Sequence, residues 1–261
     1  MKKLDSLLLR NTTMEGKVVV IKLGGKVLTE EKKKNHLLKQ IVGLSRKMPV
    51  VVVHGGGPDI TKNLQKAGIK IKFIGGLRYT NEKMIPFIWE VLNKINKDLV
   101  EKIHLLGGKA VGLSGEVGNL LLAKRIERLG LVGEPKLVNA NLLRLFLKNR
   151  VIPVISSLGT DGKGVTLNIN ADTFASAIAL VLKAKKLVFL TDRPGVINKN
   201  GKLIPTIRQK EIPKLMRNKI VSEGMIPKLK SSLQATKKNV GTVIITNGEK
   251  GLDYGTKIVN W

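Results

Sequence analysis

The sequence predicts an α/β protein with a central, mostly parallel sheet. Apolar strand-like runs alternate with segments of helical period along the whole chain, which is the pattern of strand–helix–strand units. No period in the sequence indicates repeats, and no low-complexity linker separates domains. With 261 residues, 43% of them hydrophobic and 25% charged, the chain is long enough to bury a sizeable core.

Six strands and six helices are expected in alternation. The strand candidates are short runs rich in valine, isoleucine and leucine, and the helix candidates are longer and amphipathic. The expected strands are 17–22, 50–54, 110–113, 151–156, 187–191 and 242–246, and the expected helices are 30–47, 59–67, 82–106, 139–148, 171–183 and 227–237. A soft boundary near residue 165 divides the chain into an N-terminal lobe (1–165) and a C-terminal lobe (166–261), with the sheet continuing through it.

The charge of the chain is strongly basic and widely dispersed. There are 47 Lys and Arg against 19 Asp and Glu, a formal net charge of +28. Three explanations compete: a general drift toward surface lysine, steering of anionic substrates, and binding of nucleic acid. Aromatic residues are only 3% of the chain, too few for base-stacking platforms, so nucleic acid is the least favoured partner.

The sequence has no cysteine, no long apolar segment and no signal-peptide pattern, and these absences limit the possible chemistry and location of the protein. There are no cysteines, which excludes disulfides, thiolate metal sites and cysteine nucleophiles. No apolar stretch approaches the roughly 18 residues of a membrane span, and the first residues do not have the order of a signal peptide. We therefore expect a cytoplasmic protein without a membrane partner.

Glycine pairs and triplets follow three of the strand-like runs. The run at 17–22 continues into KLGGK, at 22–26, the run at 50–54 continues into VHGGGPDI, at 53–60, and GGLRYT, at 75–80, follows the stretch 69–74. Ligands of open α/β sheets bind beyond the carboxyl ends of the strands, where glycine lets backbone N–H groups approach an anion. Neither the Walker A nor the GxGxxG motif is present, so these glycines predict a phosphate cradle of another kind.

Two further segments carry polar residues at expected helix starts. In LNINADT, at 167–173, Asn170 suits an N-cap and Asp172 complements the helix dipole, whereas capping leaves Asn168 without a function. We therefore favour a ligand contact for Asn168. In EGMIPK, at 223–228, Lys228 opposes the dipole of its helix, which indicates that it meets another anion.

Taken in order, these motifs resemble the amino acid kinase superfamily, and most closely its members that phosphorylate N-acetyl-L-glutamate. The segments that carry the resemblance are IKLGG, VVVHGGGPDI, GGLRYT, AVGLSG, NINADT, LTDRPGV and EGMIPK, between Val18 and Val259. The resemblance implies an αβα sandwich whose N-terminal lobe holds N-acetyl-L-glutamate and dimerises, and whose C-terminal lobe holds ATP with Mg²⁺. It implies ATP-dependent phosphorylation of the side-chain carboxylate in arginine biosynthesis.

The resemblance also implies roles for individual residues. Lys22 and Lys228 would be catalytic and stabilise the transferring phosphoryl group, and Asp172 would hold both lysines in place. The other implied contacts are Gly56, Gly57, Arg78 and Asn168 with the amino acid substrate, and Gly24, Gly25, Asp192, Gly195 and Gly224 with ATP. No residue is expected to bind a metal, since Mg²⁺ is often held largely by phosphates and water. The three histidines, His36, His54 and His104, are expected to be structural, because an acceptor carboxylate is already ionised at neutral pH.

Three points distinguish this chain from the family pattern or leave alternatives open. Tyr79 and Asn81 stand beside Arg78 where the family usually has Val and Asp. The compact segment at 248–259 favours a homodimer over an arginine-inhibited hexamer. A kinase of glutamate or aminoadipate attached to an acidic carrier protein is the nearest alternative activity, and a basic nucleic-acid-binding protein on a kinase fold is the alternative from another class.

Overall fold

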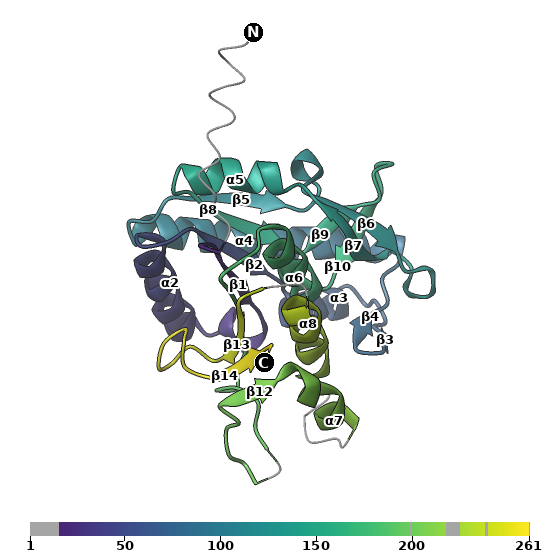
Figure 1. Ribbon diagram of the computed structural model, residues 1–261. Coiled ribbons are helices and arrows are strands. Elements are labelled where there is room, and N and C mark those ends of the chain that lie inside the picture. Colours follow the sequence, from purple (N-terminus) through teal and green to yellow (C-terminus); the bar gives the residue numbers. More distant parts are fainter. Residues whose placement is uncertain (1–15, 199, 218–224, 238–239, 261) are drawn as a thin grey trace, which may run out of the picture.

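The computed structural model describes residues 16–198, 200–217, 225–237 and 240–260. Their centre is an eight-stranded sheet, which Figure 1 shows edge-on between helices. Every pair of neighbouring strands in it is parallel except β13 and β14. In spatial order, the strands are β12 (Thr206–Arg208), β14 (Thr256–Val259), β13 (Thr242–Thr246), β11 (Lys186–Leu190), β1 (Val19–Leu23), β2 (Val50–His54), β8 (Ile152–Ser156) and β5 (Ala110–Ser114).

Helices cover both faces of this sheet. The α-helices in the described part of the chain are α2 (Glu31–Ser45), α3 (Gly57–Lys66), α4 (Ile85–Leu105), α5 (Ala140–Lys148), α6 (Ala171–Val181), α7 (Ile212–Arg217) and α8 (Ile226–Lys237). Successive residues of β2 show the two faces: Val51 belongs to the apolar core with Phe174 of α6, and Val52 to the core with Leu38 of α2. The molecule is therefore the αβα sandwich that the resemblance implied, with burial on both sides of its strands.

A second, smaller β-structure lies beside the sheet and was not predicted. The strands β6 (Leu121–Arg125), β7 (Val132–Val138), β9 (Leu158–Thr160) and β10 (Thr166–Ile169) form a small closed barrel. The boundary expected near residue 165 falls between β9 and β10, which pair antiparallel with each other. The central sheet takes strands from both sides of that boundary, and the division into a substrate lobe and an ATP lobe stays a prediction.

The glycine pair at 75–76 forms a tight turn, which was not predicted. It joins β3 (Phe73–Ile74) to β4 (Leu77–Arg78), and the two strands pair antiparallel outside the central sheet. Gly75 and Gly76 have φ values of 58° and 79°, the left-handed conformation that a two-residue hairpin turn requires. A tight turn thus accounts for the conformation of this pair. Gly76 also lines the cavity described below, and an anion contact there stays a prediction.

The six strands and six helices expected from the sequence are all confirmed. The bounds of β2 and β13 agree fully, and the other boundaries differ by at most two residues, apart from the start of α4. The helix expected at 82–106 is a 3₁₀ turn, η2 (Glu82–Met84), followed by α4. The other 3₁₀ turns in the described ranges are η1 (Gly25–Val27), η3 (Val117–Asn119), η4 (Glu127–Leu129) and η5 (Gln209–Glu211). None of the described helices has the length and apolar character needed to cross a bilayer.

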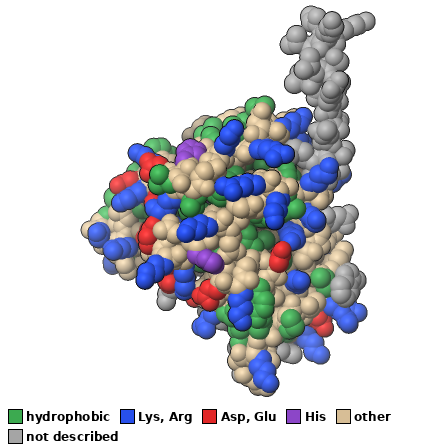
Figure 2. All heavy atoms as spheres, turned by 90° about the vertical axis from the view of Figure 1, so that its left-hand side faces the viewer, with side chains coloured by type: hydrophobic (Ala, Val, Ile, Leu, Met, Phe, Trp, Pro, Cys, Tyr) green, Lys and Arg blue, Asp and Glu red, His purple; other side chains and the backbone are tan. Residues whose placement is uncertain are grey.

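The basic side chains are spread over the surface. Figure 2 shows one face of the molecule, on which Lys and Arg side chains are scattered among neutral polar surface and a smaller number of carboxylates. They do not gather into one continuous band on this face. The basic residues are thus dispersed on this face as they are along the sequence. On the side shown, they do not form the continuous basic patch that binds a nucleic-acid backbone.

Candidate active site

The site forms where parallel strands end at one edge of the sheet. β1 pairs in parallel with β2 on one side and with β11 on the other, so that Lys22 lies in register with Val53 and Phe189. The glycine loop at 24–25 follows β1, and the glycines at 55–57 follow β2. The carboxyl edge of an open parallel sheet is where ligands of such folds bind.

Two lysines far apart in the chain meet one buried carboxylate. Lys22 Nζ, at the end of β1, lies 3.0 Å from Oδ1 of Asp172, and Lys228 Nζ, in the first turn of α8, donates a hydrogen bond of 3.0 Å to Oδ2 of the same side chain. Asp172 is in the first turn of α6, which packs beside α8 (Figure 1). The structure therefore brings together the three residues that the resemblance named as the catalytic set.

Burial and charge set the protonation of this group. Lys22 is only 7% exposed and Asp172 only 5%. Burial lowers the pKa of Lys22, and the neighbouring charge of Lys228 adds to this, against the attraction of Asp172. Burial by itself would raise the pKa of Asp172, but the two ammonium groups outweigh it and hold that pKa below its ordinary value. One carboxylate between two cations leaves a surplus positive charge, which favours an anion beside it.

Gly24 is needed because the end of Lys22 lies over it. A Cβ built on Gly24 would be 2.1 Å from Lys22 Nζ, well inside any permitted contact. Gly25 begins η1 with φ +64°, a conformation that glycine adopts at little cost. The two glycines thus have separate reasons: Gly24 leaves room for the ammonium group, and Gly25 allows the backbone to turn.

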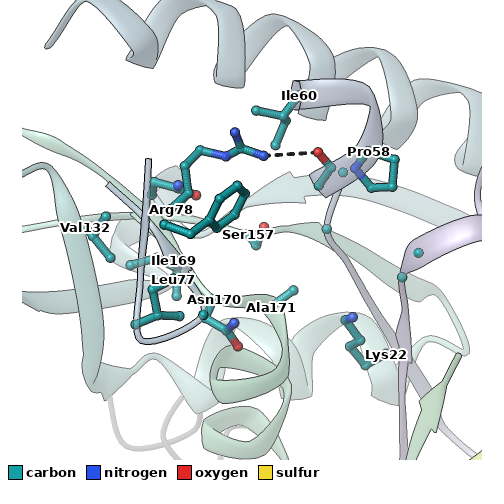
Figure 3. A pocket seen from close by; sticks show the side chains of 18 residues that line it. Lys22, Pro58, Ile60, Leu77, Arg78, Val132, Ser157, Ile169, Asn170 and Ala171 are labelled. Carbon is teal, nitrogen blue, oxygen red and sulfur yellow. Dashed lines mark hydrogen bonds between the residues drawn. The ribbon is translucent and has the colours of Figure 1, made fainter. Parts of the chain in front are cut away.

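A cavity of about 230 Å³ opens beside Lys22, and Arg78 forms its opposite end (Figure 3). The Nη2 atom of Arg78 donates to Gly57 O at 3.1 Å and to Thr61 Oγ1 at 2.7 Å, and its guanidinium lies 4.9 Å from the centre of the Phe73 ring. Its Nη1 atom is buried without a hydrogen-bond partner, and no carboxylate pairs with it within the described ranges. Burial lowers its pKa, yet a guanidinium stays protonated in proteins. The cavity therefore contains an uncompensated buried cation, which suits a carboxylate ligand.

The asparagines of the 167–173 segment have partners in the protein. Asn170 is the N-cap of α6, as predicted, and its Oδ1 accepts from the backbone N–H groups of Asp172 and Thr173. Asn168 lies in β10 and donates from Nδ2 to Oγ1 of Thr80 at 3.0 Å. Asn168 thus has a structural contact that the sequence did not reveal. Both asparagines also line the cavity.

The glycines after β2 lie on the wall of the same cavity. Gly55, Gly56 and Gly57 all line it, and Gly57 begins α3 with Pro58 in its first turn. Gly56 also packs closely on α4, since an added Cβ would lie 2.9 Å from Ile95 Cδ1. The N-terminus of a helix with free N–H groups favours a negative charge, so this wall is suited to an anion.

The other residues expected to contact the nucleotide belong to the C-terminal part of the chain. Asp192 is exposed, follows β11, and accepts a hydrogen bond of 3.0 Å from Thr191 Oγ1. Gly195 is buried, and an added Cβ would lie 2.9 Å from the backbone nitrogen of Thr256, so close packing against β14 explains this glycine. Neither residue lines the cavity described above. Gly224 lies outside the described residues.

The described residues contain no group of three or more His, Asp or Glu side chains that could hold a metal ion. His54 and His104 have ordinary structural contacts, with Asn96 and with the backbone of Ala110. These contacts agree with the structural role expected for both.

Some cavity residues were not identified from the sequence. Ser157, directly after β8, and Phe73, under Arg78, both line the cavity. Ser157 follows a buried strand whose carboxyl end lies at the same edge as those of β1 and β2, so its position was a usable signal. Nothing in the sequence near Phe73 indicates that its ring packs against a guanidinium.

Comparison with known proteins assigns this arrangement to a class. Residues 17–247 match the model of the amino acid kinase family, and the chain belongs to that family. More particularly, it is similar to an acetylglutamate kinase of Endomicrobium trichonymphae, 38% identical over 90% of this chain and 95% of that protein. It is also 42% identical to an acetylglutamate kinase of Nitrobacter hamburgensis, over 88% of this chain and 83% of that one. Among solved structures, smu.665 from Streptococcus mutans UA159 has a TM-score of 0.86 and 31% identity, covering 94% of this chain and 99% of the other.

Proposed function

We propose that this chain transfers the γ-phosphoryl group of ATP to the side-chain carboxylate of N-acetyl-L-glutamate, a step of arginine biosynthesis. The single observation that carries the proposal is the cavity with a cation at each end: Lys22, in its buried group with Asp172 and Lys228, faces Arg78 across it. A dicarboxylate placed between them has one carboxylate to be held and one to be phosphorylated. The similarity to acetylglutamate kinases supports this choice of acceptor.

Lys22 and Lys228 stabilise the phosphoryl group as it passes from the leaving oxygen of ATP to the attacking oxygen of the acceptor carboxylate. Phosphoryl transfer depends mainly on positioning and on neutralising charge at the equatorial oxygens. The lysine ammonium groups are fixed by Asp172 at 3.0 Å each, so they need not reorganise when the charge develops. Asp172 keeps both lysines protonated and in place, and is therefore a positioning residue.

Arg78 binds the carboxylate that does not react. Nη1 of Arg78 has no hydrogen-bond partner, and no carboxylate pairs with Arg78 within the described ranges. A carboxylate that enters the cavity supplies both the acceptor for Nη1 and the opposite charge. Asn168, held by Thr80, contributes its side-chain amide from the adjacent wall, and the N–H groups of Gly56 and Gly57 serve the same ligand from the opposite side. The acceptor carboxylate, with an ordinary pKa near 4.3, needs no general base.

The ATP phosphates lie against the Gly24–Gly25 loop, where the backbone is accessible and Lys22 is next to it. The family implies ATP and, with it, Mg²⁺. Mg²⁺ enters as part of the nucleotide complex and is held by phosphates and water, since the described residues offer no carboxylate cluster for it. Asp192 and Gly195 border the remaining part of the nucleotide, and the contact expected for Gly224 stays a prediction.

The test is acyl phosphate formation by the purified full-length protein. ATP, Mg²⁺ and N-acetyl-L-glutamate are supplied, and the product is trapped with hydroxylamine as the hydroxamate. Glutamate, aspartate and aminoadipate serve as comparison acceptors. Hydroxamate with N-acetyl-L-glutamate in clear preference is the expected result, and preference for another acceptor would overturn the substrate assignment.

Two accompanying expectations concern the protein in solution. We propose a homodimer formed through the N-terminal lobes, which sedimentation of the purified protein measures directly. A cytoplasmic location likewise stays a prediction, which fractionation of cells tests.

A further inference from the structure

A buried histidine outside the proposed chemistry stands beside the glycine loop of the cavity. His54 is the last residue of β2, is fully buried, and precedes Gly55. Burial lowers its pKa to about 4, so the ring is neutral at ordinary pH. A neutral imidazole has one N–H donor and one acceptor nitrogen, and its neighbours determine which nitrogen carries the proton.

The neighbours of His54 select the form protonated on Nδ1. Nδ1 lies 3.2 Å from the carbonyl oxygen of Gly55, which can only accept, and Nε2 lies 3.0 Å from Nδ2 of Asn96, which can only donate. The orientation of the Asn96 amide is itself fixed, because Nδ2 also lies 2.9 Å from Val154 O. Gly112 leaves room for this amide, since a Cβ there would lie 2.2 Å from Asn96 Oδ1.

The hydrogen bond to Gly55 O determines where the next N–H points. The described peptide bonds are all trans, and in a trans peptide the C=O and the N–H of one unit point in opposite directions. With Gly55 O held toward the buried ring, the Gly56 N–H points away from it, and the loop that carries this N–H, Gly55 to Gly57, lines the cavity. Within the described ranges, this N–H has no hydrogen-bond acceptor.

The same helix supports the loop by packing. A Cβ on Gly56 would lie 2.9 Å from Ile95 Cδ1 and 3.2 Å from Leu92 Cδ2. In α4, Ile95 is the residue next to Asn96, and Leu92 lies one turn before Asn96. The loop is therefore seated on α4 by apolar contact and oriented by the chain of bonds from Asn96 through His54 to Gly55. These are independent contacts with one consequence, a fixed direction for one backbone donor.

We propose that His54, held by Asn96 in the form protonated on Nδ1, is a positioning residue that aims the Gly56 N–H at an anionic oxygen of the acceptor. This inference rests on the proposed function, because the acceptor is the proposed occupant of the cavity. His54 does not touch the reacting atoms. It acts by orienting one peptide group. An oriented N–H donor stabilises an oxygen most when negative charge develops on that oxygen in the transition state.

The first test uses the unaltered protein and needs no turnover. Side-chain ¹⁵N NMR at neutral pH distinguishes a protonated Nδ1 from a protonated Nε2, and the expected result for His54 is a protonated Nδ1. The backbone amide signal of Gly56 is then followed as N-acetyl-L-glutamate is added without ATP, and it is expected to shift. A proton on Nε2, or a Gly56 signal unmoved at saturation, would overturn the proposal.

A matched pair of variants tests the donor itself. The amide nitrogen of asparagine occupies nearly the place of histidine Nδ1, so His54→Asn keeps a donor for Gly55 O, whereas His54→Leu has nearly the same shape as asparagine and no donor. We expect kcat/KM for the acceptor to be about tenfold or more lower in His54→Leu than in His54→Asn, with KM for ATP alike in both; complete loss of an aligned donor typically costs 10²–10³. Ile103→Val, a buried change elsewhere in α4, is the control for general loosening of that helix.

The outcomes separate this proposal from the proposed function. If His54 only filled space, leucine would serve a buried site at least as well as asparagine, and equal or higher turnover in His54→Leu would refute the positioning role. If the unaltered protein preferred another acceptor, the substrate assignment would fail. The protonated nitrogen of His54, and the kcat/KM values of His54→Leu and His54→Asn measured with that other acceptor, would still decide the role of His54. Should neither variant fold, the NMR result on the unaltered protein decides it.

Discussion

Replacing Gly24 by alanine should impair catalysis through a side chain that is not itself changed. The new methyl group would lie 2.1 Å from Lys22 Nζ, and an ordinary contact begins at about 3.4 Å, so the ammonium must retreat by about 1.3 Å. The clash falls on the end of a side chain and not on backbone, and the fold is therefore retained. A misplacement of about 1 Å in a reacting geometry can cost 10²-fold in rate, and we expect a loss of kcat of about that size.

The assay is hydroxamate formation under saturating ATP and N-acetyl-L-glutamate, with thermal unfolding measured in parallel. Gly43→Ala is the matched control, since a Cβ at that position in α2 meets nothing within 4 Å. If Gly24→Ala acts only through Lys22, the double variant with Lys22→Ala should be no slower than Lys22→Ala alone. Turnover near that of the unaltered protein in Gly24→Ala, or independent losses that multiply in the double variant, would refute this reasoning.

Three further substitutions test the charged groups. Lys228→Ala should lower kcat by about 10²–10³ with little change in acceptor affinity, as measured by initial rates and by calorimetric titration of the acceptor; a change confined to KM would contradict its catalytic role. Arg78→Ala should instead raise KM for the acceptor by roughly 10- to 100-fold, the equivalent of charge-assisted hydrogen bonds worth about 1.5–3 kcal/mol, and an unchanged KM would remove Arg78 from the binding site. Asp172→Asn takes away the group that raises the pKa of Lys22, so Lys22 loses its proton at lower pH and the alkaline limit of kcat should move to lower pH; an unmoved limit in the pH–rate profile would show that Lys22 is not the titrating group. Because the pKa of Asp172 is lowered on folding, its contribution to stability is complete above its unfolded value and is lost as pH falls, so the same variant should show a weaker acid dependence of its unfolding free energy.

The central sheet could be predicted because its strands are buried on both faces. In the strand VVVVH, at 50–54, the first four residues are β-branched and all five are buried, which is typical of a strand covered on both faces. The strands of the small barrel carry a weaker signal: β7 reads VGEPKLV, with Pro135 and exposed charged residues among its apolar ones. The sequence therefore gave little reason to separate such segments from loops.

The candidate site shows the same limit. Lys22 and Lys228 are 206 positions apart, and no spacing rule predicts that both contact Asp172; the expectation came from the resemblance alone. Glycine was read as a sign of anion binding, but Gly75 is a turn residue and Gly56 also makes room for Ile95. These reasons depend on neighbours brought close by folding, which a single sequence does not display.

The order along the chain of the residues proposed to be catalytic has a consequence during synthesis. β1 and Lys22 leave the ribosome first and α8 with Lys228 almost last, while β13 and β14, which complete one side of the sheet, follow α8. A nascent chain thus carries its glycine loop and half of its cationic pair long before the second cation can join the same carboxylate. The site as proposed is therefore complete only after α8 has been synthesised and has packed against α6.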